Sequence, residues 1–320
     1  MTDQRRASLY LIGATLFWGL SFPLTRALAV AQQANLPLAS TWFLTALTVA
    51  VRFGVAGVVM LGLALRGGMR PTRSEWVQGL GLAFFASGGL IFQNDGLFRT
   101  TASVSAFLTQ SYCAILPLYT AVRLRKWPRA VEIFALGLVI AGVAILSGVR
   151  WGDLHLGRGE IETLVCSVFF AGQILWLERA EFQSNRPVVF STIMFLAIAA
   201  AMSGVTGLTM AQASDFFQAF HGWPSWFLVA ALTVGCTLVT FTAMNRWQPH
   251  VSATDAGLIY CLEPVFAAVF ALFLPGALAI WMELDLENEL FTSALVLGGA
   301  AILLANLAVL LAPKSRLEVP

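Results

Sequence analysis

Residues 40–65 read STWFLTALTVAVRFGVAGVVMLGLAL, a run of 26 residues with a single charge, Arg52. A helix of about 20 mostly apolar residues is long enough to cross the roughly 30 Å hydrocarbon core of a bilayer. This stretch therefore predicts a membrane-spanning helix. Its length and composition are the standard against which the rest of the chain can be compared.

Nine further stretches share these two properties. They cover residues 8–30, 76–96, 101–122, 131–149, 160–179, 187–210, 224–246, 251–274 and 291–312. Hydrophobic residues make up 58% of the chain and charged residues 11%, whereas globular domains average about 45–50% and about 25%. The longest connectors, around 211–224 and 275–289, are too short to bury a core of their own. We predict an all-α integral membrane protein with ten transmembrane helices, whose function resides in those helices.

The basic residues alternate between connectors, which indicates the orientation. The N-terminal segment and every second connector hold fourteen of the nineteen basic residues: Arg5, Arg6, Arg66, Arg70, Arg73, Arg123, Arg125, Lys126, Arg129, Arg179, Arg186, Arg246, Lys314 and Arg316. Positive residues favour the cytoplasmic side of a membrane. We predict a multi-pass protein of a bacterial-type inner membrane with both termini cytoplasmic.

Two internal matches suggest a repeat. The stretch Thr15–Gly19 aligns with residues ending at Gly172, at an offset of 153, and residues 105–110 align with 255–260 at an offset of 150. Near-equal offsets predict two halves, residues 1–150 and 151–320. Because each half has five spans, an odd number, the second half enters the membrane in the opposite orientation, which is typical of transporters.

Four motifs resemble the drug/metabolite transporter superfamily, in its ten-span branch built from two EamA-type halves. They are Ala14–Pro23 (ATLFWGLSFP), Val51–Phe53, Ala102–Ala106 (ASVSA) and, most specifically, Leu262–Ala268 (LEPVFAA). The resemblance implies two inverted five-helix repeats around a central cavity. It also implies a transporter rather than an enzyme, one that exports small amphipathic metabolites by alternating access.

Chains similar to this one export amino acids, often aromatic ones, so the resemblance favours an aromatic or hydrophobic amino acid as the substrate. A multidrug or cationic-compound exporter is the alternative. The chain departs from the family at Cys113 and Ala114, where the first half often has Glu or Ser followed by Pro. The long acidic connector before the last span is a second departure, for which we expect a hydrating role.

Ionisable groups deep in a span are costly, which marks them as candidates for function. Arg52 and Glu263 lie near the middle of their spans. Glu263 has two open roles, as a proton-sensitive or amine-binding group, or as half of a structural pair; Pro264 beside it is a point where the helix can flex. Arg52 is either a carboxylate clamp or a structural partner. Arg26 and Asp95, near span ends, either pair as a gate or reach toward the interface.

A second set of residues is predicted to line the cavity. The polar residues Gln93, Asn94, Gln110 and Tyr112 are denser than lipid would tolerate, and the aromatic residues Trp18, Phe22, Trp176 and Tyr260 offer flat faces to an aromatic or cationic solute. The glycines Gly137, Gly142, Gly298 and Gly299 favour close helix packing within the chain, with a homodimer as the alternative.

The sequence offers little for other function classes. The cysteines Cys113, Cys166, Cys236 and Cys261 all lie in apolar stretches, and the three histidines all lie in connectors. We expect no metal, cofactor, disulfide or nucleic acid partner. The expected partners are a small-molecule substrate and the lipid bilayer. An intramembrane enzyme or a non-transporting membrane partner remains the alternative of another class.

Overall fold

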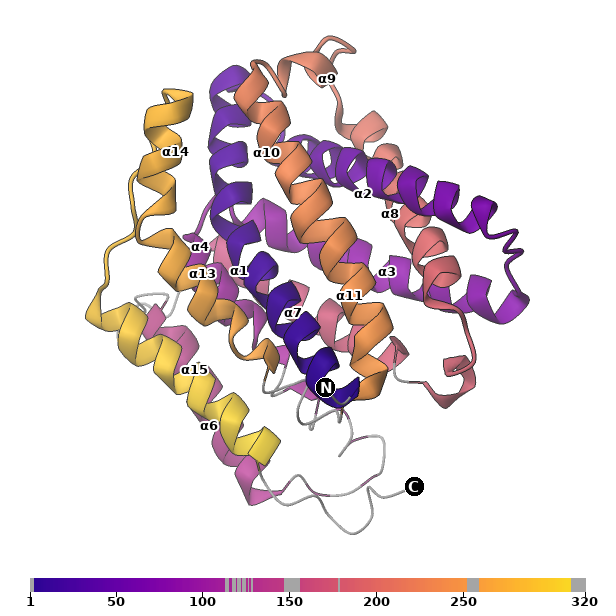
Figure 1. Ribbon diagram of the computed structural model, residues 1–320. Coiled ribbons are helices and arrows are strands. Elements are labelled where there is room, and N and C mark those ends of the chain that lie inside the picture. Colours follow the sequence, from indigo (N-terminus) through magenta and orange to yellow (C-terminus); the bar gives the residue numbers. More distant parts are fainter. Residues whose placement is uncertain are drawn as a thin grey trace.

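The computed structural model describes residues 3–112, 129–146, 156–177, 179–251 and 259–311, with residues 115, 116, 119, 122, 125 and 127 between them. The regular structure in these ranges is helical (Figure 1). The helices are α1 (Asp3–Asn35), α2 (Thr41–Arg66), α3 (Arg73–Gly96), α4 (Ala102–Thr109), α6 (Ala130–Leu146), α7 (Arg158–Leu177), η1 (Ala180–Phe182), α8 (Pro187–Thr209), α9 (Asp215–Gln218), α10 (Trp223–Thr233), η2 (Val234–Val239), α11 (Thr240–Trp247), η3 (Gln248–His250), α13 (Glu263–Ala271), α14 (Leu274–Met282) and α15 (Ser293–Leu311).

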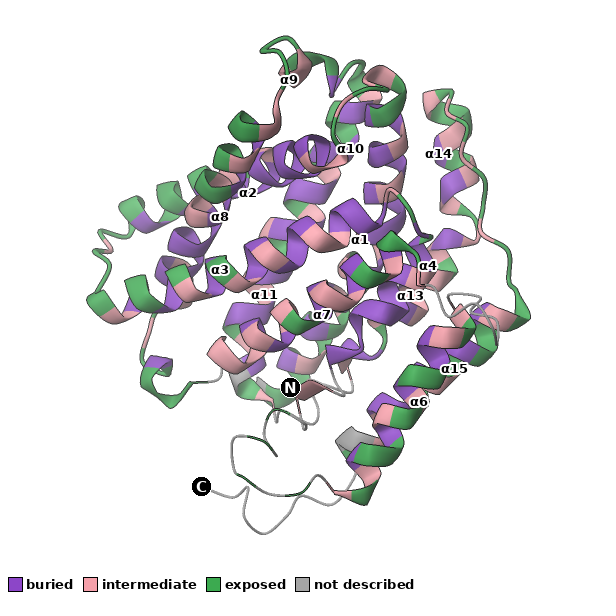
Figure 2. Cartoon of the chain, turned by 180° about the vertical axis from the view of Figure 1, so that it is seen from behind, coloured by how far each residue is buried: buried purple, intermediate pink, exposed green. Residues whose placement is uncertain are grey.

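The stretch that opened the sequence analysis forms α2, within a residue of its predicted bounds. One face of α2 is buried, including Phe43 and Phe53, whereas Val55 and Val58 on other faces are exposed. Exposed residues also mark faces of the outer helices in Figure 2, and many of the exposed residues of the protein are large and apolar. In a bilayer these faces meet lipid tails, which are as apolar as the side chains themselves.

Six described segments are long and apolar enough to cross a membrane: α1, α2, α3, α7, α8 and the continuous run α10–η2–α11. A seventh is the pair α13 and α14, which is bent by 50°. Helices α6 and α15 are apolar but shorter as described. The predicted spans 101–122 and 251–274 fall partly outside the described residues, as do Cys113 and Ala114, so the number ten stays a prediction.

One predicted boundary is wrong. We expected a connector over residues 275–289, but α14 occupies Leu274–Met282. Pro275 lies in the first turn of this helix, where its missing N–H costs nothing and its fixed φ suits a helix. The Asn288 side chain then accepts a hydrogen bond from the Gly276 N–H at 2.7 Å. Pro275 therefore starts a helix after a bend and does not end the span.

The helices pack in pairs that join the two halves of the chain. Helix α2 packs on α8, α3 on α7 and α6 on α15, the last pair lying side by side at one edge of Figure 1. A Cβ atom on Gly142 would lie 2.8 Å from the Gly298 carbonyl oxygen, so these glycines let α6 and α15 touch. Gly299 meets Phe107, whereas Gly137 has open space around it. Packing within one chain accounts for Gly142, Gly298 and Gly299.

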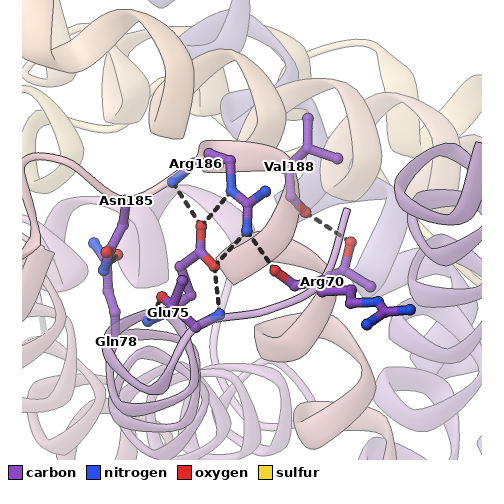
Figure 3. A network of polar contacts seen from close by, with 8 residues as sticks. Arg70, Glu75, Gln78, Asn185, Arg186 and Val188 are labelled. Atoms are coloured by element: carbon purple, nitrogen blue, oxygen red, sulfur yellow. Dashed lines mark hydrogen bonds and ion pairs between the residues drawn. The ribbon is translucent and has the colours of Figure 1, made fainter. Parts of the chain in front are cut away.

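The helices define two ends of the molecule. The connectors 67–72 and 179–186 lie at what we call the basic end, and the connectors 97–101 and 283–292 at the acidic end. At the basic end, Thr72 and Glu75 form a capping box that starts α3. The buried Glu75 carboxylate binds the Arg186 guanidinium at 2.7 and 2.8 Å, and Arg186 also donates to the Arg70 carbonyl oxygen (Figure 3). This network joins the start of α3 to the start of α8.

The network predicts that truncating Arg186 lowers the stability of the protein more than truncating Arg70 does. Arg186→Ala leaves the Glu75 carboxylate buried without its cation, and we expect a loss of about 2 kcal/mol in the free energy of unfolding. Arg70→Ala is the matched control, because only the backbone carbonyl of Arg70 takes part. Thermal unfolding of the purified protein measures both; equal losses would contradict the assignment.

Candidate functional site

A central cavity lies between helices from both parts of the chain. Its empty space amounts to about 820 Å³ when its open mouth and the solvent there are included. The lining comes from α1, α2, α3, α4, α7, η2, α11 and α13: Trp18, Ser21, Phe22, Thr25, Arg52, Leu90, Gln93, Asn94, Leu97, Thr109, Tyr112, Phe170, Gln173, Ile174, Cys236, Phe241, Met244, Tyr260 and Glu263. Most of this surface is apolar, with a small number of polar groups.

Two helix ends meet beside this cavity. Helix α4 ends at Thr109 and is followed by a turn at Gln110, and α13 begins at Glu263 after a turn over residues 261–262. The Gln110 side chain donates to the Tyr260 carbonyl oxygen at 2.9 Å and to the Glu263 carboxylate at 3.3 Å. We had expected Gln110 to line the cavity, but it lies just behind the wall. There it holds the two helix ends together.

Pro264 has a different setting from the predicted one. It lies in the first turn of α13, where a proline is well tolerated, and not in the interior of a continuous helix. We expected Pro264 to be a flexible point within a helix. It lies instead where a helix starts after a turn. Glu263 occupies the same first turn, where the positive end of the helix dipole stabilises a carboxylate.

Arg52 is 4% exposed and lines the cavity from α2. Its Nη2 donates to Thr237 Oγ1 at 3.0 Å, and among the described residues its Nε finds no acceptor. Thr237 belongs to η2, a π-helical turn inside the run α10–η2–α11. Such π-helical turns occur frequently at functional sites. A buried guanidinium with a free N–H is a ready partner for an anionic group.

Aromatic rings cover much of the cavity wall. Trp18 lies edge-on to Phe241 and to Tyr260, with ring centroids 5.8 Å apart in each case. Phe22 lines the wall nearer the acidic end, in a cluster with Leu97 and Ala102. Tyr112 adds a further ring and is buried. These rings offer flat apolar contact to a bound solute.

Trp176 is not among the cavity residues, contrary to our expectation. Its Nε1 donates to the Gln78 carbonyl oxygen at 3.2 Å, and the Arg179 guanidinium stacks over its ring. Each residue turns an α-helix by about 100°, so Trp176 points well away from the stripe that Phe170 and Ile174 form on α7. It packs against α3 instead.

Asp95 is buried and Arg26 half-buried at the acidic end, but they bind other partners. Asp95 forms an ion pair with Arg158 at 2.7 Å, and Arg26 donates to the Leu97 carbonyl oxygen. The predicted Arg26–Asp95 pair is therefore absent from this structure. Arg158 starts α7 and reaches Asp95 across the contact between α3 and α7.

The acidic connector does more than hydrate the surface. The Glu289 carboxylate accepts hydrogen bonds from the backbone N–H groups of Ala102 at 2.7 Å and Ser103 at 3.3 Å. It thereby caps α4, a role that suits a carboxylate at the positive end of a helix. This cap ties the connector before α15 to the first half of the chain.

Several cavity residues were not predicted. Ser21, Thr25, Thr109, Phe170, Gln173, Cys236, Phe241 and Met244 all line the wall. Gln173 had a usable signal, because it is a polar residue in an apolar span, like Gln93. Phe170, Phe241 and Met244 had none, since an apolar residue in an apolar helix faces lipid and cavity equally well.

These features define a multi-pass helical membrane protein with an internal cavity beside the end of α4 and the start of α13. The resemblance to the EamA-type transporters is confirmed: residues 5–148 match the EamA-like transporter family. An uncharacterized transporter of Archaeoglobus fulgidus is 25% identical over 311 residues, covering 95% of this chain and 86% of that protein. A crystal structure of another protein has a TM-score of 0.57 and 20% identity, covering 95% of this chain and 96% of that one, which shows a shared fold.

The contact between α1 and α13 should be intolerant of added volume. A Cβ atom on Gly19 would lie 2.6 Å from Phe266 Cβ and 2.9 Å from the Glu263 carbonyl oxygen, whereas one on Gly13 meets nothing within 4 Å. We expect Gly19→Ala to cost about 1–3 kcal/mol through overpacking. Gly13→Ala, on the same helix, should be neutral or stabilising. Thermal unfolding of both variants tests this, and a neutral Gly19→Ala would contradict the packing.

Proposed function

We propose that this chain is a membrane transporter that exports small amphipathic metabolites, foremost amino acids with aromatic or hydrophobic side chains, by alternating access. The observation that carries the proposal is the composition of the cavity. Among its described lining residues, Arg52 is the one cation and Glu263 the one acid, and aromatic rings surround them. A free amino acid carries one carboxylate, one amino group and a side chain, and the cavity offers a partner for each.

We further propose that the chain consists of two inverted repeats, residues 1–150 and 151–320, with ten spans in a bacterial-type inner membrane and both termini cytoplasmic. One contact supports the repeat. Gln110 and Tyr260 are equivalent under the offset of 150, and the Gln110 side chain binds the Tyr260 carbonyl oxygen. Positions near a pseudo-two-fold axis are expected to touch their own equivalents.

The pairing of the helices also supports the repeat. Take α1–α4 and α6 as spans one to five. The repeat then makes α1 equivalent to α7, and α3 equivalent to α11. The contact of α3 with α7 is therefore equivalent to the contact of α11 with α1, and the structure contains both. The pairs α2 with α8 and α6 with α15 are each their own equivalent. Transport by rocking of two such halves places the substrate at their interface, where the cavity lies.

A cationic-compound exporter is the second candidate, because the Glu263 carboxylate and the Trp18 ring would also suit a cation. The two candidates differ in the use of Arg52. A carboxylate-binding guanidinium prefers an amino acid over its decarboxylated amine, whereas a cation site prefers the amine.

The first experiment is thermal unfolding of the purified protein with amino acids, their amides and their decarboxylated amines, since a ligand that binds only the folded state raises the unfolding temperature. We expect a rise with aromatic amino acids and a smaller one with the matching amines. A rise confined to the amines would favour the cation exporter. No rise with any of them would remove the support for both substrate classes.

The aromatic wall predicts a specific loss of binding. Trp18→Ala removes a ring from the cavity, and we expect the affinity for an aromatic amino acid to fall about tenfold. Trp176→Ala removes a ring of the same size from α7 outside the cavity and should leave the affinity unchanged. Titrations monitored by thermal shift compare the two variants. An equal loss of affinity in the two variants would mean that the Trp18 ring does not contact the aromatic side chain of the bound amino acid.

Glu263 predicts the behaviour of transport with pH. If protons couple to transport through this carboxylate, Glu263→Gln should abolish the pH dependence of transport while keeping an acceptor for Gln110. Solute flux into proteoliposomes at several pH values measures it, with thermal unfolding as the control for folding. Unchanged pH dependence in a folded variant would assign Glu263 a structural or amine-binding role.

A further inference from the structure

A cluster at the acidic end holds more negative than positive charge in a buried place. Asp95, in the last turn of α3, is 0% exposed, and Glu162 on α7 is 6% exposed. Both bind one guanidinium: Arg158 Nη2 lies 2.7 Å from Asp95 Oδ2, and Arg158 Nε lies 2.6 Å from Glu162 Oε1. Two ionised carboxylates on one arginine would leave a net charge of −1 at the contact between α3 and α7.

Each carboxylate also keeps one buried oxygen without a donor. Among the residues that the structure describes, Asp95 Oδ1 and Glu162 Oε2 have no hydrogen-bond partner. Because one guanidinium binds both groups, the two carboxylates are neighbours. Buried polar atoms without partners are rare and costly. A single proton between these two oxygens would give each of them a partner and neutralise the cluster.

We propose that Asp95 and Glu162 form a proton-binding site that holds one shared proton and clamps α3 to α7 at the acidic end. This site is separate from the cavity carboxylate Glu263. The proposal goes beyond the transport function. The two groups lie outside the cavity, and they would bind the proton whether or not a substrate is present.

Other charged groups around the site have partners of their own. Glu160 accepts a hydrogen bond from Thr100 at 2.9 Å, and Arg99 donates to Thr41. Arg26 donates to a backbone carbonyl, and Glu289 caps α4. The contact of α4 with α7 is uncharged, because Ser105 of α4 meets Thr163 of α7 there. In the described part of the chain, Arg158 is thus the one cation that binds the pair.

The site lies where a change in charge would act on the cavity. A Cβ atom on Gly96 would lie 2.9 Å from the Gly159 carbonyl oxygen, so α3 and α7 touch backbone to backbone beside the pair. Asn94, next to Asp95, lines the cavity. Loss of the proton places two negative groups across this contact and weakens it. The proton concentration at the acidic end therefore acts on the contact between α3 and α7 beside the cavity.

The test is thermal unfolding as a function of pH, in detergent and without any transported solute. In the wild type, the stability from the shared proton is present at mildly acidic pH and lost as the pH rises. In Asp95→Asn and in Glu162→Gln, an amide N–H takes the place of the proton. Both variants should lack this pH-dependent fall and exceed the wild type in unfolding temperature at mildly alkaline pH.

Glu160→Gln is the matched control, since it removes a neighbouring carboxylate that binds only Thr100 among the described residues; it should keep the pH dependence of the wild type. If Asp95→Asn and Glu162→Gln are both less stable than the wild type at every pH, both carboxylates are ionised and the proposal fails. A rise in the stability of the wild type with sodium, at constant ionic strength and alkaline pH, would identify a metal cation in place of the proton and overturn it as well.

Infrared spectroscopy gives a second measurement that needs no change at the pair. The Glu263→Gln protein should retain a carbonyl band of a protonated carboxylic acid, and this band should disappear as the pH rises. Absence of the band would overturn the proposal. Neither experiment requires transport, so a failure here leaves the proposed function untouched, and a failed ligand panel leaves this site untouched.

Discussion

The hydrocarbon core of a bilayer supplies no hydrogen bonds, so every backbone N–H and C=O group in it needs a partner inside the protein. A helix can therefore be interrupted at that depth only where other protein groups or a water-filled cavity satisfy the freed groups. Helix α4 stops at Thr109 and α13 starts at Glu263, both within stretches long enough to span. The Gln110 amide supplies one of the required partners, at the Tyr260 carbonyl oxygen. Both helix interruptions lie beside the cavity, because polar backbone groups can find partners there.

Helix lengths could be predicted from the sequence because the bilayer thickness sets them. The bounds of α2 and α8 lie within about one residue of the predicted spans. The prediction failed at Pro275, because a proline reads as the end of a helix whether it closes one or opens the next. Only the three-dimensional structure, in which α14 runs from Leu274 to Met282 after a bend of 50°, reveals which of the two it does.

The candidate site was predictable where a residue stands out against an apolar background. Arg52, Glu263 and Trp18 all do, and all three line the cavity. Phe241 and Met244 line it too, but an apolar residue gives no sign of whether it faces solute, lipid or another helix. The partner of Asp95 was also beyond prediction, because Arg158 is 63 residues away and only the packing of α3 on α7 brings them together.

An amide and a carboxylate meet where α4 ends and α13 begins, and this pairing has a physical reason. Gln110 and Glu263 touch at 3.3 Å. Two carboxylates at that distance and depth could not both be ionised. The amide of Gln110 avoids the conflict, donates to the Glu263 side chain and leaves one acidic group on the cavity wall. With Arg52 as the one basic side chain among the described lining residues, the wall holds one basic and one acidic group. A glutamate in place of Gln110 would put a second acidic side chain at this contact, so the proposed preference for a zwitterion depends on the amide at position 110.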